Sequence, residues 1–194
     1  MIERRKLFGG LGNMMFQYAF LYSLLLDGKI PNIYLQSEKF FFKHRGKIKE
    51  LYGRGIGHID KVSIHIRRGD YINNPFYVDL TTTDYYQKAI AHFPDDKFLI
   101  FCADRQPGSD DTTDKSWAMD FINTLGIGDR SEMFTGDSEI DDMNAMASCK
   151  AHIMANSSFS WWASYLGHGK VIAPKDWYSD GRQRTELLRS WTII

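Results

Sequence analysis

Three short segments of this 194-residue chain carry side chains that could do chemistry. The first is His65-Ile66-Arg67-Arg68-Gly69-Asp70, where two adjacent guanidinium groups follow an apolar run. Guanidinium groups are rigid forks of N–H donors that match phosphate oxygens, and burying two of them together is costly unless an anion or carboxylate meets them. The segment predicts either a site for a nucleotide diphosphate or an ion pair of Arg67 or Arg68 with Asp70, with His65 as a hydrogen-bonded core residue.

The second segment is Gly9-Gly10-Leu11-Gly12-Asn13, which precedes an apolar run. Where side chains are absent, backbone amides at the start of a helix can approach an anion closely. Met15 stands where a dinucleotide fingerprint requires glycine, and no Gly-Lys-Ser/Thr follows to form a Walker loop. The segment predicts either a tight turn or a ligand loop.

The third segment reads NSSFSWW over residues 156–162. Hydroxyl groups and free amides at a helix start form a neutral cradle for anions, and tryptophan rings can pack or stack on a base or a sugar. Helix capping would explain one of the serines, and core packing would explain a tryptophan. The run of both exceeds what capping needs, so it indicates a second ligand-binding loop.

Other kinds of site are not supported by the residue pattern. The chain shows no metal-ligand spacing and no Gly-x-Ser-x-Gly elbow of a hydrolase. Its two cysteines, Cys102 and Cys149, do not form a zinc or disulfide pattern. The acidic pair Asp141-Asp142 is interpreted as a solvated helix face or an N-terminal helix charge.

The three segments lie on alternating strand and helix signals. Expected strands cover residues 5–8, 32–36, 62–67, 97–101, 132–135, 151–155 and 170–173. Expected helices cover residues 14–26, 38–51, 83 or 84 to 92, 117–125, 140–148, 159–166 and 183–191. This alternation predicts an α/β fold with a mainly parallel sheet and right-handed crossovers. Because ligands bind at the carboxyl ends of parallel strands, the three segments should meet there.

Composition indicates a globular protein without a general affinity for polyanions. Hydrophobic residues make up 43% and charged residues 25% of the chain, while Lys+Arg and Asp+Glu both number 24. Nucleic acid is therefore not an expected partner, and any anion recognition must be local.

The cysteine usage favours a reduced, intracellular protein. Residues 14–26 follow a basic stretch as the apolar part of a signal peptide would, but glycines interrupt the junction and no small-x-small cleavage site follows. The run is also shorter than the roughly 20 residues that span a bilayer. We expect a cytoplasmic location, with a peripheral position at the inner membrane face as the alternative.

Several blocks in this order resemble glycosyltransferase family 11, the α-1,2-fucosyltransferases. They are GGLGNMMFQYA (9–19), HIRRGDYI (65–72), CKAHIMANSSFSWWASYL (149–166) and KVIAPKDWY (170–178), with QSEKFF (36–41) and TDYYQKAI (83–90) between them. The resemblance covers most of the chain except its loops. It implies a GT-B-like fold and metal-independent transfer of fucose from GDP-fucose to a galactose 2-hydroxyl with inversion, without a further cofactor.

The resemblance also implies roles for single residues. Arg67 falls on the arginine that meets the donor diphosphate, His65 lies beside the nucleotide, and Asp70 is the carboxylate that could accept the acceptor proton. Alternatively, a phosphate oxygen of the leaving group takes that proton and Asp70 positions Arg68. Expected donor-binding residues are Gly10, Gly12, Asn13, Arg68, Asp104, Asn156, Ser157, Ser158, Phe159 and Ser160.

The chain departs from the family pattern in its length and at several positions. The shortening falls between Gly28 and Asn32, so we expect a reduced N-terminal lobe on the acceptor side over residues 1–60. Residues 61–180 would form the GDP-sugar-binding, Rossmann-like lobe, and residues 181–194 a helix that packs back on it. Ser-Asp-Asp of the family is replaced by Cys102-Ala103-Asp104, with a second candidate at residues 109–111, so guanine recognition depends on a compensating carboxylate.

Two function classes follow from these observations. The first is a galactoside 2-alpha-L-fucosyltransferase acting in polysaccharide biosynthesis, with GDP-fucose and a galactose-containing glycan as partners. The second is a non-catalytic GDP-sugar or glycan binding protein whose small lobe cannot position an acceptor. A homo-oligomer that buries the edge of the lobe is a third arrangement.

Overall fold

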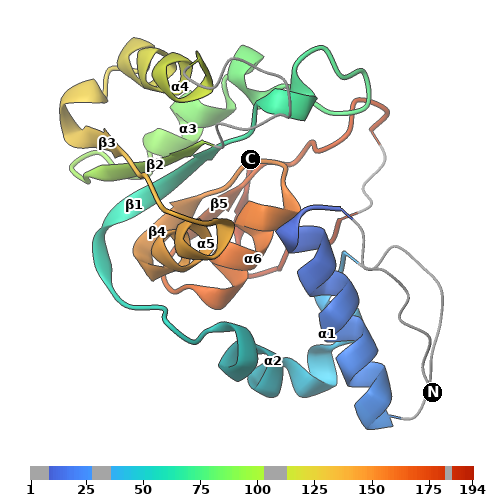
Figure 1. The fold of residues 1–194 in the computed structure, drawn as a ribbon. Coiled ribbons are helices and arrows are strands. Elements are labelled where there is room, and N and C mark those ends of the chain that lie inside the picture. Colours follow the sequence, from blue (N-terminus) through green and yellow to red (C-terminus); the bar gives the residue numbers. More distant parts are fainter. Residues whose placement is uncertain (1–8, 28–35, 103–112, 182–184) are drawn as a thin grey trace.

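Six strands of the described chain form a parallel sheet at the centre of the protein (Figure 1). The computed structural model describes residues 9–27, 36–102, 113–181 and 185–194. The strands are β1 Ile59–Ile66, β2 Phe98–Cys102, β3 Ser131–Met133, β4 Cys149–Ile153, β5 Val171–Ala173 and β6 Thr192–Ile193. They pair in parallel in the order β3-β2-β1-β4-β5-β6. This order is that of a Rossmann-type sheet, so the expected α/β class is confirmed.

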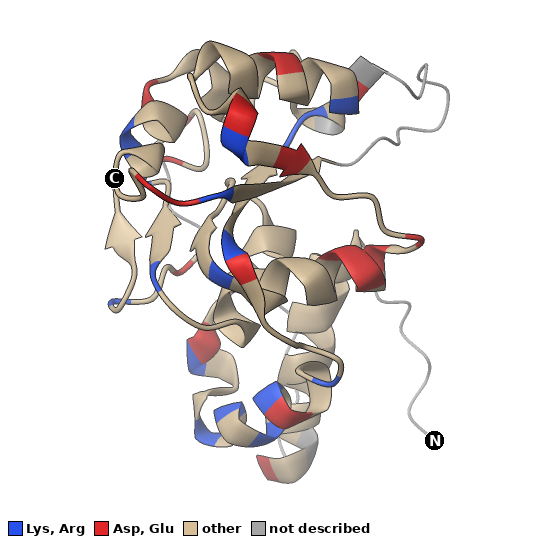
Figure 2. Ribbon diagram, turned by 90° about the vertical axis from the view of Figure 1, so that its left-hand side faces the viewer, with Lys and Arg blue, Asp and Glu red and all other residues tan. Residues whose placement is uncertain are grey.

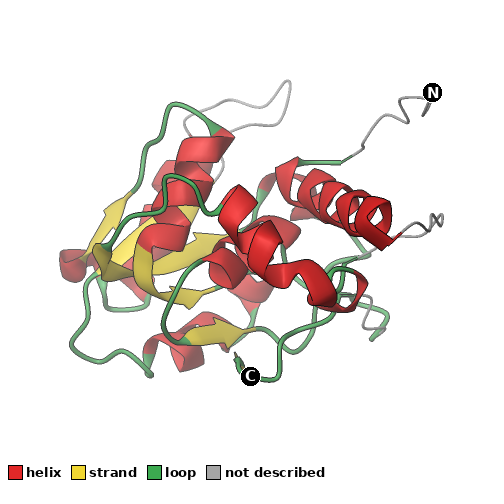
Figure 3. Ribbon diagram, turned by 90° about the horizontal axis from the view of Figure 1, so that it is seen from below, coloured by secondary structure: helices red, strands yellow, loops and turns green. Residues whose placement is uncertain are grey.

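Helices cover both faces of this sheet. On one face lie α3 (Tyr85–Ile90) and α4 (Thr113–Thr124), and on the other lie α5 (Glu139–Ser148) and α6 (Ser158–Leu166). Beyond α6, α1 (Leu11–Asp27) and α2 (Arg45–Tyr52) lie side by side (Figures 1 and 3). The described residues also include short 3-10 turns: η1 Glu38–Phe40, η2 Phe42–His44, η3 Gly69–Tyr71, η4 Leu80–Thr82 and η5 Gly128–Arg130.

Strand β1 alternates its side chains as the sequence predicts. Val62 and Ile64 are fully buried in the core shared with α3 and α4. Successive side chains of a strand point to opposite faces, so Ser63 and His65 are directed towards α6. There the Ser63 hydroxyl lies 2.9 Å from Nδ1 of His152 on β4. The polar side chains of β1 therefore lie on the face of the sheet that α6 covers.

Aromatic packing holds α1 against α6. The Phe16 ring is 1% exposed, and its centroid lies 4.6 Å from that of Trp161 and 4.9 Å from that of Trp162. Aromatic pairs at such tilted geometry add stability beyond the area that they bury. This contact places the start of α1 beside the start of α6.

The single helix expected over residues 38–51 is wrong. The chain instead forms η1, η2 and α2, because Phe41 adopts φ −135° and ψ 11°, outside the helical region. Its ring is 1% exposed and stacks on Trp162 at 5.4 Å. Burial of this ring is stronger than the local helical preference, as tertiary packing often is.

The helix expected over residues 183–191, within the 181–194 segment, is also wrong over the part that is described. Residues 185–191 form an irregular segment without a helix, and Thr192–Ile193 adds β6 to the sheet edge beside β5. The backbone N–H of Glu186 donates to the Gln36 carbonyl, and its carbonyl accepts from the Trp161 indole. Those groups would otherwise serve helical hydrogen bonds, so tertiary partners replace the helix.

Two expected strands lie mostly or wholly in residues that the structure does not describe. The strand over residues 5–8 and nearly all of the strand over 32–36 lie outside the described residues. The division into a lobe over residues 1–60 and a lobe over 61–180 stays a prediction. In the structure, side chains of α1, α2, α5 and α6 share one hydrophobic core.

Charged residues of both signs are spread over the ribbon (Figure 2). This mixed distribution agrees with the equal numbers of acidic and basic residues in the sequence. No helix in the described ranges is both long enough and apolar enough to cross a membrane.

Replacing Phe16 tests the packing of α1 on α6. Phe16→Ala should lower the free energy of unfolding by about 3–5 kcal/mol, because it leaves a cavity between two tryptophans. Phe76 is 69% exposed, and Phe76→Ala should change the same quantity by less than about 0.5 kcal/mol. Denaturant unfolding followed by tryptophan fluorescence measures both, and equal losses would contradict the packing.

Candidate nucleotide-sugar site

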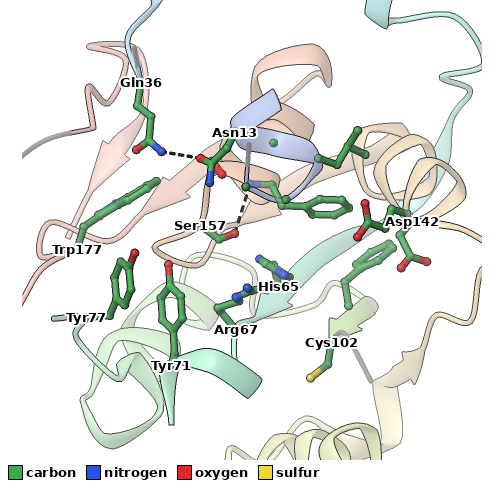
Figure 4. A pocket seen from close by; sticks show the side chains of 18 of the residues that line it. Asn13, Gln36, His65, Arg67, Tyr71, Tyr77, Cys102, Asp142, Ser157 and Trp177 are labelled. Atoms are coloured by element: carbon green, nitrogen blue, oxygen red, sulfur yellow. Dashed lines mark hydrogen bonds between the residues drawn. The ribbon is translucent and has the colours of Figure 1, made fainter. Parts of the chain in front are cut away.

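A pocket of about 280 Å³ opens where the strand order of the sheet reverses, between β1 and β4. Open parallel sheets bind ligands in the crevice outside the carboxyl ends of their strands at this point. Figure 4 shows His65 and Arg67 in the middle of the pocket, Asp142 on one side, and Gln36, Trp177 and Tyr77 on the other. All three segments singled out in the sequence contribute to its lining.

His65 and Arg67 bring the end of β1 into the pocket. The His65 side chain is 4% exposed, and its Nδ1 has no hydrogen-bond partner within the described residues. Burial, and secondarily the positive charge of Arg67, lower the pKa of His65 to about 3. The imidazole is therefore neutral at physiological pH, and Arg67 supplies the positive charge of this part of the pocket.

Arg68 leaves the pocket in the opposite direction. Its Nε donates to Asp114 of α4 at 3.0 Å, and its guanidinium lies 3.6 Å from the Trp117 ring centroid. Arg68 is not among the residues that line the pocket, and it makes a structural contact with α4. Its expected contact with the donor stays a prediction. Gly69 follows with φ +60°, which side chains rarely adopt, and turns the chain into η3.

Asp70 is placed by its backbone in η3, and its side chain lies outside the described part of the structure. Asp104 also lies outside the described residues, as does the alternative carboxylate segment 109–111. Their expected roles stay predictions.

The starts of α1 and α6 meet at the pocket. A Cβ on Gly12 would lie 2.6 Å from the backbone nitrogen of Phe159, so the close approach of the two helices requires glycine. Ser157 caps α6 by accepting a hydrogen bond from the Phe159 amide, and Ser158 lines the pocket beside it. Two helix N-termini thus add favourable potential for an anion next to Arg67.

Asn156 and Ser160 hold the loop before α6 in shape. The Asn156 amide donates to the carbonyls of Val78 and Trp177 at 2.9 and 3.0 Å. The Ser160 hydroxyl is fully buried and donates to the Ala155 carbonyl at 3.0 Å. Neither side chain is among the residues that line the pocket, and both hold the loop that carries Ser157 and Ser158. Their expected direct contact with the donor stays a prediction.

Asn13 belongs to a chain of hydrogen bonds that ends in the pocket. Thr185 donates its hydroxyl proton to Oε1 of Gln36, and Nε2 of Gln36 donates to Oδ1 of Asn13 at 2.7 Å. Gln36 and Thr185 are almost fully buried, at 5% and 0% exposure. The direction of this chain sets which end of each amide is a donor. Gly10 also lines the pocket here.

Sequence reasoning missed the carboxylate end of the pocket, formed by Glu139 and Asp142 in the first turn of α5. Asp141 is exposed and bonded to Ser138, as expected of a solvated helix start, but Asp142 is half-buried and turned to the pocket. Burial raises the pKa of Asp142. Because α5 follows β3, whose carboxyl end faces the same edge, the topology could have pointed to it.

Sequence reasoning also missed the aromatic end of the pocket, formed by Tyr71, Tyr77, Trp177 and Tyr178. Tyr71 and Tyr77 stack at 4.1 Å with 9° between their planes, and Tyr77 and Tyr178 are joined by an antiparallel bridge. The signal that could have found them is the position of Trp177 and Tyr178 just after β5. Tyr77 lies outside every motif, so only the fold shows that it belongs here.

Within the described residues, no three His, Cys, Asp or Glu side chains lie together so that they could hold a metal ion.

Comparisons with known proteins agree with the geometry. An alpha-1,2-colitosyltransferase of Escherichia coli is 31% identical over 88% of this chain and 62% of its own length. The O-antigen biosynthesis glycosyltransferase WbnK of Escherichia coli is 32% identical over 66% of this chain and 43% of its own length. The chain thus spans less than two thirds of either relative. No solved structure matches.

The family model described as glycosyl transferase family 11 matches residues 42–194. This range contains β1 to β6 and all of the pocket except the residues of α1, the glycines before it and Gln36. The chain belongs to glycosyltransferase family 11.

Proposed function

We propose that the chain transfers L-fucose from GDP-fucose to the 2-hydroxyl of a galactoside, with inversion and without a catalytic metal. Membership of family 11 and a relative named for an α-1,2 linkage support this activity. The observation that carries it is the position of Arg67, in a pocket at the reversal of strand order beside the starts of α1 and α6.

The charges of the pocket suggest how the donor lies in it. A diphosphate is repelled by the carboxylate end and attracted by Arg67 and the two helix starts. Guanine presents N–H donors that a carboxylate accepts, so the base belongs beside Asp142. The diphosphate then lies in the middle of the pocket, where Arg67 would stabilise the charge that develops on GDP as the bond to the sugar breaks.

The acceptor hydroxyl must lose its proton. We propose Asp70 as the general base, with transfer to a phosphate oxygen of the leaving GDP as the alternative. In that alternative Asp70 would help to position Arg68, whose guanidinium also contacts Asp114 and Trp117.

The relative named as an alpha-1,2-colitosyltransferase favours a second candidate donor, a nucleotide-linked colitose. Colitose lacks one ring hydroxyl of fucose, so the two donors would share the nucleotide contacts and differ at the sugar.

Calorimetry with GDP-fucose, followed by measurement of GDP release with and without a β-galactoside, tests the activity. We expect binding, release that the galactoside stimulates, and no loss of release in EDTA. Parallel runs with GDP-colitose compare the two donors. Binding without release would support the non-catalytic alternative, and failure to bind either nucleotide sugar would contradict both functions.

The adjacent arginines provide a matched pair of variants. Arg67→Ala should lower turnover by a factor of about 100 or more, because it removes a charge that stabilises the transition state. Arg68→Ala should lower the melting temperature but keep most of the affinity for GDP, since its partners are Asp114 and Trp117. Steady-state kinetics, calorimetry and thermal unfolding separate the two effects. Equal loss of GDP affinity in both variants would rule out this division of roles.

The adjacent aspartates provide a second pair. Asp142→Asn should weaken GDP binding about tenfold and leave ADP binding nearly unchanged, because the carboxylate is proposed to accept guanine N–H groups. Asp141→Asn should change neither, since Asp141 is exposed and lies outside the pocket lining. Titration with both nucleotides measures the ratio. If Asp142→Asn leaves the ratio of the GDP and ADP dissociation constants unchanged, guanine does not bind at the carboxylate end of the pocket.

A further inference from the structure

We infer that the aromatic end of the pocket, together with Asn13 and Gln36, is the subsite for the hexose of the donor. This inference rests on the proposed function, which places a diphosphate at Arg67. It goes further by assigning the sugar to residues to which the sequence analysis gave no role, chiefly Tyr77 and Trp177.

The position of Arg67 sets where the hexose must lie. The Arg67 guanidinium is 5.3 Å from the centroid of the Tyr71 ring, and Tyr77 stacks on the same ring. A hexose bonded to a phosphate at Arg67 therefore lies next to the stacked rings of Tyr71 and Tyr77. The opposite direction leads to Asp142 and Glu139, whose charges favour the base (Figure 4).

The aromatic end is rigid enough to read the shape of a sugar. The Tyr71 hydroxyl donates to the Asn156 carbonyl at 2.8 Å, while the Asn156 side chain binds the carbonyls of Val78 and Trp177. One buried residue thus joins the segments that carry Tyr71, Tyr77 and Trp177. A subsite held in this way needs little ordering when its ligand binds.

The chemistry of the subsite fits a deoxyhexose. Aromatic side chains provide apolar surface for the methyl group and C–H face of a 6-deoxy sugar. Beside them, the hydrogen bonds from Thr185 through Gln36 to Asn13 present an oriented amide for ring hydroxyls. Sites built to hydrogen-bond a hydroxyl discriminate strongly against sugars that lack it. The indole Nε1 of Trp177 is buried and has no partner within the described residues, so it adds a donor at this wall.

Comparison of GDP with GDP-fucose isolates the sugar contribution. Tyr77→Leu should weaken binding of GDP-fucose about tenfold more than binding of GDP, because it removes an aromatic face. Tyr77→Phe should restore the wild-type ratio of the two dissociation constants. Phe76→Leu is the matched control, since Phe76 is adjacent but 69% exposed. Calorimetry on the full chain gives both constants.

Gln36→Met provides a second, independent variant on the polar side. It breaks the hydrogen-bond chain to Asn13 and should also weaken the binding of GDP-fucose more than the binding of GDP. Thermal unfolding shows whether each variant is folded. If both variants weaken the binding of GDP and of GDP-fucose equally, or raise only the KM for the acceptor, the subsite does not hold the donor hexose. If the wild type binds neither nucleotide, the proposed function fails and this subsite with it.

Discussion

The pocket depends on the close approach of α1 and α6. The absence of a side chain at Gly12 allows the first turn of α1 to lie against the backbone of Ser158 and Phe159. One turn further on, Phe16 packs between Trp161 and Trp162 and holds the two helices together. Because α6 follows β4 directly, this contact brings the starts of both helices to the reversal of strand order. The glycine segment and the serine segment therefore act as one surface.

The adjacent arginines have different roles: Arg67 lines the pocket, and Arg68 stabilises the fold. Successive residues at the end of a strand point in opposite directions, so Arg67 enters the pocket while Arg68 reaches α4. Arg68 is neutralised by Asp114 and covered by Trp117, which makes it part of the fold. His65 stays neutral beside Arg67 because burial lowers its pKa. The pocket thus has a single fixed positive charge from β1, between a carboxylate end and an aromatic end.

Much of the fold could be predicted because its elements have strong local signals. The alternation of Val62, Ile64 and Ile66 predicts β1, and serine followed by an apolar run predicts α6. The two wrong helices have the same cause. Phe41 leaves the helical region to stack on Trp162, and the backbone of Glu186 bonds to Gln36 and Trp161. Local preference competes poorly with the burial of an aromatic ring or with a tertiary hydrogen bond.

The sequence by itself determined the parallel α/β class, the family and the central members of the site, because these lie in short runs at the ends of strands. His65 and Arg67 are two residues apart, and Ser157 to Phe159 are continuous. Only the tertiary structure decided the two ends of the pocket. Asp142, Gln36 and Tyr77 come from distant segments with no shared spacing, and they meet through crossovers that return each strand to the same edge of the sheet. The tertiary structure also decided the direction of each side chain, because that direction depends on the residues that pack around it.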